Sequence, residues 1–217
     1  MWERNVVYTK QYDSVPPDER EIFRYAKTRG DTAREKELLA ECLESALPAA
    51  RLRVCFGIFD VKTDGRNAVF PFGSFASADL ARLLSGSDAA LVFAATAGGG
   101  IDRLIMKYSS LSPARALMYE AIGNERAEAA CDALCEEIER EPGLQGKLTA
   151  RFSPGYGDLD LATQKVILPA LNAERLIGVT LGEALIMSPS KSVTAVCGIK
   201  SDAKRFLSGG NDFREAE

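Results

Sequence analysis

Ala89-Ala90-Leu91-Val92-Phe93-Ala94-Ala95-Thr96 is the stretch of this 217-residue sequence that says most about the fold. It is a continuous run without a charge or a turn-forming residue, which is typical of a strand buried on both faces. Such a strand needs neighbouring strands beside it and helices packed on it. We therefore expect it in the middle of a sheet, with the rest of the chain arranged around it.

Upstream of this run, two segments favour strands. Arg51–Phe59 alternates in polarity, and Ala68–Phe72 follows after a Lys62-Thr63-Asp64-Gly65 turn. This spacing predicts a β-hairpin. A short helix is expected from about Ser77 to Leu84, just before the apolar run.

The N-terminal part is charged and has helical periodicity from Asp18 to about Pro48. Gly30-Asp31-Thr32 interrupts the periodicity, and Asp31 or Thr32 could cap a second helix. We expect two short helices packed against the body. The predicted organisation is an N-terminal helical extension, residues 1–50, on an α+β domain, residues 51–217, forming one compact unit overall.

Downstream of the run, Gly98-Gly99-Gly100 precedes a helix expected from Ile101 to about Tyr108. A glycine-rich loop before a helix can cradle a phosphate, because it bares backbone amides at a helix N-terminus. This one lacks the Lys and Ser/Thr of a P-loop, and we favour a tight turn or close backbone packing.

Ser112-Pro113 predicts the start of a long helix, which runs to about Arg140 and which Pro142-Gly143 ends. From Lys147 onward, strands and one helix are expected to alternate up to a last strand at Ser192–Ile199. This mixed order predicts an α+β fold with a twisted, largely antiparallel sheet and flanking helices.

Composition excludes several classes of protein. The chain is 46% hydrophobic, and its 27 basic and 31 acidic residues give a net charge of −4 without a long basic run. We therefore expect no nucleic-acid partner. No apolar stretch approaches the roughly 20 residues of a membrane span, and the start Met1-Trp2-Glu3-Arg4 does not resemble a signal peptide. We expect a cytoplasmic protein with no membrane partner.

Histidine is absent, and the five cysteines are scattered among apolar neighbours. Triads with a histidine base and histidine-ligated zinc are therefore impossible. An odd number of scattered cysteines favours reduced, buried thiols over a disulfide framework. Cys131 and Cys135 lie one helical turn apart, and we favour core thiols over a metal site for this pair, so no metal is expected.

Glu128 lies on an apolar stripe of the long helix. The residues that project within about 20° of it at 100° per residue are Leu117, Ala121 and Cys135. A carboxylate on such a stripe should face a cleft, a cation or a ligand, because its burial without a partner is costly. Alternatively, Glu125 and Asp132 on one flank make this side a solvated acidic edge.

The segment Arg151-Phe152-Ser153-Pro154-Gly155-Tyr156-Gly157 can bind a small zwitterion. Pro and Gly fix a tight loop between a guanidinium and an aromatic ring. Arg151 can hold a carboxylate through two hydrogen bonds, and Tyr156 can offer its face to a flat ring or a sulfonium. An ordinary loop with a core-packed tyrosine is the alternative.

Two motifs in the C-terminal half resemble the activation domain of cobalamin-dependent methionine synthase. The first is Arg151-x-x-Pro154-Gly155-Tyr156, and the second is the stretch from Ile177 to Val193 with its Gly-x-x-Leu-x-Glu-x-x-x-Met-x-Pro-x-x-Ser-Val pattern. The strong similarity covers about Lys147–Val193, and a looser one covers the long helix around Glu128.

The resemblance implies an α+β domain that binds S-adenosylmethionine. Arg151 would hold the methionine carboxylate, and Glu128 would accept hydrogen bonds from donors of the ligand or pair with its positive charge. Main chain near Phe152 and the ring of Tyr156 would complete the site, with Pro154 and Gly155 shaping its loop. The family has a tyrosine where this chain has Cys197, which would lie at the far wall of the site.

The implied function is that of a subunit for reductive reactivation, in which inactive cob(II)alamin takes one electron and then the methyl group of S-adenosylmethionine. A separate cobalamin-binding methionine synthase subunit or corrinoid protein is the expected partner, with a flavoprotein as the candidate electron donor. Without histidine the chain cannot supply the Asp-x-His-x-x-Gly ligand, so we expect cobalamin only through the partner and no turnover by the chain alone. The alternatives are an adaptor that docks on a corrinoid protein without using S-adenosylmethionine, and an unrelated enzyme that binds a phosphate at Gly98–Gly100.

Overall fold

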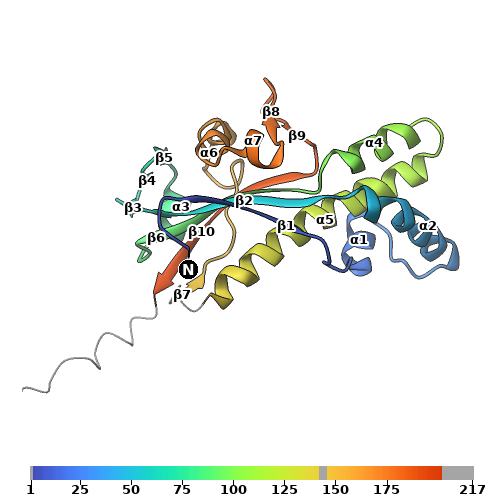
Figure 1. Cartoon of the computed structure of the whole chain (residues 1–217), viewed down its shortest axis with the longest axis horizontal. Coiled ribbons are helices and arrows are strands. Elements are labelled where there is room, and N and C mark those ends of the chain that lie inside the picture. Colours follow the sequence, from blue (N-terminus) through green and yellow to red (C-terminus); the bar gives the residue numbers. More distant parts are fainter. Residues whose placement is uncertain (1, 142–145, 202–217) are drawn as a thin grey trace, which may run out of the picture.

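A curled five-stranded sheet with helices on both sides is the centre of the computed structural model, which describes residues 2–141 and 146–201 (Figure 1). Each strand is antiparallel to its neighbours. The order across the sheet is β1 (Val7–Tyr12), β2 (Leu52–Asp60), β6 (Ala89–Thr96), β10 (Ser192–Ser201) and β7 (Gly146–Leu148). The expected α+β class with a largely antiparallel sheet is confirmed.

Strand β6 is the middle strand, and all eight of its residues are buried. Because side chains alternate across a sheet, its odd-numbered residues Leu91 to Ala95 pack in one core and its even-numbered residues Ala90 to Ala94 pack in another. The first core contains helix α5, and the second contains Ile167 and Ile177. The prediction of a central strand buried on both faces is confirmed.

The helices divide between these two cores. Helix α5, of 28 residues, crosses one side of the sheet, while α6 and α7 lie on the other side (Figure 1). The helices on the α5 side are α1 (Glu19–Tyr25), α2 (Ala33–Ala49), α4 (Gly99–Tyr108) and α5 (Pro113–Arg140), and those on the opposite side are α3 (Ala78–Leu83), α6 (Gln164–Ala170) and α7 (Ala173–Ile177). Among the described residues, no helix is long and apolar enough to span a membrane.

Local capping explains where several helices begin. The Ser112 hydroxyl accepts a hydrogen bond from the amide of Arg115, and Pro113 is the first residue of α5, as predicted. Thr32 caps α2, and Glu35 binds back to the amide of Thr32 in a capping box. The predicted end of α5 at Pro142-Gly143 falls outside the described residues.

The first 50 residues also contribute a strand that the sequence analysis did not identify. Strand β1 pairs along β2, and Tyr8 lies opposite Phe56. The two expected helices are confirmed as α1 and α2, but this part of the chain is not purely helical. Its treatment as a separate extension stays a prediction.

The predicted hairpin between Arg51–Phe59 and Ala68–Phe72 is wrong. Both edges of β2 are occupied, by β1 and by β6, so β2 does not pair with the segment after the turn. That segment forms a separate small sheet, whose strands are β3 (Lys62–Thr63), β4 (Asn67–Phe70) and β5 (Gly73–Ala76). The turn at Asp64 exists, because its carboxylate accepts hydrogen bonds from the amides of Arg66 and Asn67.

The C-terminal third contains more helix than expected. A single helix was predicted, but a 3₁₀ turn (Leu161–Thr163), α6 and α7 are present. Asn172 separates α6 from α7 with a φ of 51°, a left-handed conformation that asparagine tolerates better than most residues. A two-stranded hairpin of β8 (Thr180–Leu181) and β9 (Met187–Ser188) follows.

The three glycines before α4 allow close backbone packing. A Cβ at Gly100 would lie 2.0 Å from the carbonyl oxygen of Ala49, at the end of α2. Gly98 has a φ of 81°, which side chains disfavour. The interpretation as a tight turn with close packing is confirmed.

We predict that Gly100→Ala lowers the free energy of unfolding by about 1–3 kcal/mol, because α2 and α4 must move apart. Gly99→Ala is the matched control: the nearest atom to its Cβ would be 3.7 Å away, so stability should be kept. Urea unfolding followed by circular dichroism measures both. Equal stability of the two variants would show that the close approach does not constrain the fold.

Candidate functional site

Arg151 lies between two carboxylates of helix α5. Its Nη2 donates to Oε2 of Glu128 at 2.7 Å, and its Nη1 donates to Oδ1 of Asp132 at 2.6 Å. Glu128 and Asp132 are one helical turn apart and therefore share a face of α5. The fork of the guanidinium thus joins the start of the 151–157 loop to the long helix.

The position of Arg151 follows from the neighbouring backbone. Phe152 exchanges two hydrogen bonds of 2.9 Å with Val196 of β10, which ties this segment to the edge of the main sheet. Arg151 then points toward α5, where its side chain is half-buried. Burial lowers the pKa of Arg151, but the negative charges around it, including Asp132 and Glu128, outweigh burial and raise it. The guanidinium is therefore a fixed positive charge.

A groove of about 540 Å³ runs beside this ion cluster, between α5 and the N-terminal segment 14–25. Its acidic lining residues are Asp18, Glu21, Glu125, Glu128, Asp132 and Glu136. Tyr25 is the aromatic residue of the lining, and burial and the charge of Glu128 raise its pKa. The groove is therefore suited to a cation with an apolar part.

One wall of the groove is anchored by a buried ion pair. The guanidinium of Arg126 donates to both oxygens of Glu125 at 2.6 Å and to the carbonyl oxygens of Val15 and Pro16. Glu125 also accepts from the amide of Asp18. The alternative of a solvated acidic edge fails for Glu125, which is buried with these partners, whereas the side chain of Asp132 is exposed.

The apolar stripe expected around Glu128 is also only partly present. Ala121 is buried, but Leu117 is 51% exposed and Glu128 lies at the rim of the groove. The buried face of α5 is centred instead on Ile122, Arg126 and Ala130. The helical period placed Glu128 close to the core boundary, and the charge of Arg151 compensates it there.

The hydrogen bonds and ion pairs of the Arg151 cluster, as far as the described residues show, involve Glu128 and Asp132 and no other side chain of the 151–157 loop. Phe152 packs with the core on the opposite side of the sheet, Pro154 is buried, and Gly155 has a φ of 91°. Tyr156 is 69% exposed, which excludes a core-packed tyrosine. Asp158 fastens the loop by accepting from the amide of Ala78 at the start of α3.

Cys197 lies under the ion cluster and has no exposed surface. It belongs to the core cluster against which Cys135 packs, and Cys135 lines a pocket of about 300 Å³ together with Arg151. The five cysteines are free, as predicted. Cys131 is fully buried in the core, whereas Cys135 is half-buried.

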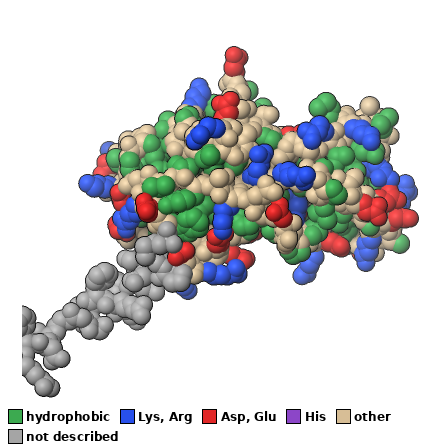
Figure 2. All heavy atoms as spheres, viewed as in Figure 1, with side chains coloured by type: hydrophobic (Ala, Val, Ile, Leu, Met, Phe, Trp, Pro, Cys, Tyr) green, Lys and Arg blue, Asp and Glu red, His purple; other side chains and the backbone are tan. Residues whose placement is uncertain are grey.

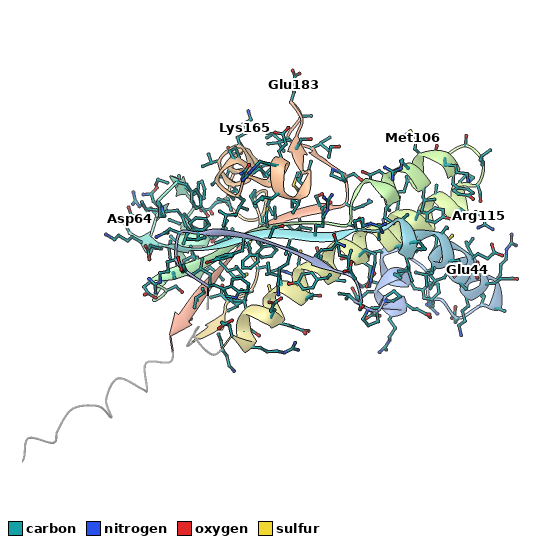
Figure 3. All side chains as sticks on the ribbon, in the orientation of Figure 1. Glu44, Asp64, Met106, Arg115, Lys165 and Glu183 are labelled. Atoms are coloured by element: carbon teal, nitrogen blue, oxygen red, sulfur yellow. The ribbon has the colours of Figure 1, made fainter. Side chains whose placement is uncertain are left out.

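A larger cavity, of about 830 Å³, lies on the opposite side of the sheet, between α6, α7 and β8. Lys165 and Glu183, labelled in Figure 3, flank it on the side away from α5. Its apolar lining includes Leu168 and Leu181. We give more weight to the smaller groove, because a guanidinium that is hydrogen-bonded to two carboxylates lies at its edge. The larger volume of the other cavity is not by itself evidence of a binding site.

The arrangement at Arg151 can bind the end of an α-amino acid. A ligand carboxylate can share the guanidinium, and a ligand ammonium can take the freed oxygens of Glu128 and Asp132. Sequence reasoning missed the role of Asp132 and of segment 14–25. The spacing of four residues between Glu128 and Asp132 could have revealed the first, whereas the second depends on tertiary packing.

Charges elsewhere are mixed. On the face shown in Figure 2, basic and acidic side chains are interspersed, so this face has no field of a single sign. This agrees with the net charge of −4.

Comparison with known proteins finds a matching family and solved structures of similar fold. A family model described as "Vitamin B12 dependent methionine synthase, activation domain" matches residues 75–210, more than half of the chain. The crystal structure of the MetH reactivation domain bound to AdoHcy is similar in fold, with a TM-score of 0.70 and 17% identity, over 93% of this chain and 81% of that one. No curated protein sequence matches the chain.

We predict that Arg126→Ala lowers the free energy of unfolding by about 3–5 kcal/mol, because it leaves the carboxylate of Glu125 buried without its partner. Arg140→Ala is the matched control on the same helix. Its pair with Glu136 is exposed, so its loss should cost no more than about 0.5 kcal/mol. Thermal and urea unfolding measure both, and similar stabilities would contradict an anchoring role for the buried pair.

Proposed function

The chain belongs to the activation-domain family of vitamin B12-dependent methionine synthase, and we propose on this basis that it binds S-adenosylmethionine at Arg151. It then presents the methyl group of this ligand to a cobalamin held outside the domain. The chain works in the cytoplasm as one component of a methyltransferase and turns over nothing alone.

The observation that carries this proposal is the pairing of Arg151 with Glu128 and Asp132. The methionine end of S-adenosylmethionine carries a carboxylate and an ammonium group. A guanidinium beside two carboxylates offers partners for both, at the edge of a groove large enough for a small ligand.

The acidic groove supports the same ligand. S-adenosylmethionine also carries a positive sulfonium, and six acidic side chains line the groove. Arginines pair with five of them: Arg126 with Glu125, Arg24 with Glu21, Arg140 with Glu136, and Arg151 with Glu128 and Asp132. None of these arginines is among the lining residues, so the surface of the groove itself favours a cationic ligand. The ring of Tyr156 is exposed but does not line the groove, so its contact with the ligand stays a prediction from the family resemblance. We assign Phe152, Pro154 and Gly155 to holding the loop.

Cobalamin would supply a cobalt centre that accepts one electron and the methyl group, leaving S-adenosylhomocysteine. This chain has no histidine for the Asp-x-His-x-x-Gly ligand, which supports a corrinoid held by a partner. The role of the chain is then to bind the donor, fix its carboxylate at Arg151 and aim its methyl group outward. A cobalamin-binding methionine synthase subunit is the proposed partner, with a flavoprotein as electron donor.

One observation favours a second function, that of an adaptor which docks on the corrinoid protein without the ligand. Both ends of the Arg151 fork are already engaged, and Cys197 is buried where the family has a tyrosine. Titration with S-adenosylmethionine separates the two functions, because an adaptor would bind the partner and not the ligand.

We predict that Arg151→Ala weakens S-adenosylmethionine binding by about 1.5–3 kcal/mol, the usual contribution of a hydrogen bond to a charged group. Arg115→Ala, at an arginine of α5 that pairs with Glu41 outside the groove, is the control and should keep the wild-type affinity. Isothermal titration calorimetry measures both. Equal affinities of the Arg151 variant and the wild type would remove Arg151 from the site.

We also predict methyl transfer only in the presence of both proteins. The purified chain is mixed with the candidate corrinoid protein of the same genome, a reductant and methyl-labelled S-adenosylmethionine. Label should reach cobalt when both proteins are present and not when either is omitted. Transfer at the same rate without this chain would contradict the reactivation role.

A further inference from the structure

Three of the five cysteines gather where α5 packs on β10. Cys131 and Cys135 are one turn apart on α5, and Cys197 faces them from the sheet. Cys135 packs against the core cluster that contains Cys197, and the two thiols are close enough to shift the pKa of each other. Within residues 2–141 and 146–201, no three side chains of the metal-ligating types are arranged to hold a metal ion. The cluster is therefore a candidate for thiol chemistry between two sulfurs.

The two thiols differ in exposure. Cys197 is completely buried, whereas Cys135 is half-buried and lines the pocket of about 300 Å³. Arg151, Thr149 and Ala150 line the same pocket, so a small reagent can approach the sulfur of Cys135 beside a guanidinium. One sulfur is thus reachable from solvent, and the second is in contact with it from inside.

The surroundings activate Cys135 in particular. The hydrogen bond from Cys197 lowers the pKa of the Cys135 thiol, against the effect of burial, and the charge of Arg151 lowers it further, while Asp132 and Glu139 act in the opposite direction. The same hydrogen bond and burial raise the pKa of Cys197. Reactivity toward oxidants follows thiolate character and access, and both favour Cys135.

We propose that Cys135 and Cys197 are an oxidation site, at which hydrogen peroxide converts the two thiols into a reversible disulfide. The Cys135 thiolate attacks one peroxide oxygen, the O–O bond breaks, and the leaving hydroxide takes a proton to become water. Cys135 is then a sulfenic acid. The sulfur of Cys197 attacks that of Cys135, the S–O bond breaks, and a second water leaves with the proton of Cys197. Two electrons pass from the thiols to hydrogen peroxide, and a dithiol reductant reverses the change.

The disulfide has a consequence for the ligand site, which rests on the proposed function. The sulfur of Cys135 shares a pocket with Arg151 and, when it is ionised, adds a negative charge beside the guanidinium. Oxidation removes this charge, so the guanidinium is left with less competition for a ligand carboxylate. The oxidised chain should therefore bind S-adenosylmethionine a few-fold more tightly than the reduced chain.

Mass spectrometry of the full chain treated with hydrogen peroxide tests the oxidation site. We expect the loss of two hydrogen masses and a peptide linking Cys135 to Cys197, both reversed by dithiothreitol. Cys135→Ser should abolish the product. Cys197→Ala should stop the reaction at a sulfenic acid on Cys135, trapped by dimedone, and Cys131→Ala, in the same cluster, is the control that should still form the disulfide.

Several results would overturn the proposal. These are an unchanged mass, a disulfide that joins other cysteines or two chains, or the same product in Cys135→Ser. If a variant fails to fold, alkylation of the native wild type by iodoacetamide tests whether Cys135 is the most reactive thiol. Modification of another cysteine before Cys135 contradicts its assignment as the thiol that is oxidised first. Titration of the reduced and the oxidised chain with S-adenosylmethionine separates the redox effect from the proposed function. Equal affinity of the two forms overturns the effect of the disulfide on Arg151, and no binding by either form counts against the proposed function alone.

Discussion

The burial of β6 on both faces is the constraint on which the rest of the structure depends. Leu91 and Phe93 need apolar cover on one side and Val92 on the other, and each such side chain contributes roughly 1.5–3 kcal/mol when it is fully buried. A single layer of helices cannot cover both faces of the strand. The strands β2 and β10 satisfy the backbone of β6 at its two edges, and separate sets of helices cover its two faces. The long helix α5 is the main cover on one face, and its outer side is thereby fixed relative to the sheet.

This placement makes the candidate site. The charged residues of α5 at its boundary with the sheet are carried to the edge where Arg151 follows β7, so two carboxylates and a guanidinium meet although they are distant in sequence. The buried pair of Glu125 and Arg126 adds the N-terminal segment as a second wall. The site is therefore a consequence of the packing of α5, and its residues come from three parts of the chain that the sheet holds together.

Sequence reasoning predicted what depends on local signals. The central strand and the start of α5 at Ser112-Pro113 follow from composition and capping chemistry. Capping chemistry also predicted a helix start at Asp31 or Thr32, and Thr32 is the cap. The strand partners of β2 could not be predicted, because β1 has a weak strand pattern. The segment after the turn at Asp64 lies close to β2 in sequence and competes with β1 for the same edge of β2. Arg151 and Glu128 were identified from residue type and family resemblance, and the structure brings these two together. The partnership of Glu125 with Arg126 was missed because adjacent residues on a helix rarely face each other, and here both bend toward segment 15–18.

The central claim is that S-adenosylmethionine lies in the groove between α5 and the N-terminal segment, with its carboxylate at Arg151. Nuclear Overhauser effects from S-adenosylmethionine carrying a ¹³C-labelled methyl group test it most directly. We expect contacts from the bound ligand to Tyr25, Ala129 and Ala133, which line the groove. Contacts to Leu168 and Leu181, in the larger cavity across the sheet, would contradict it.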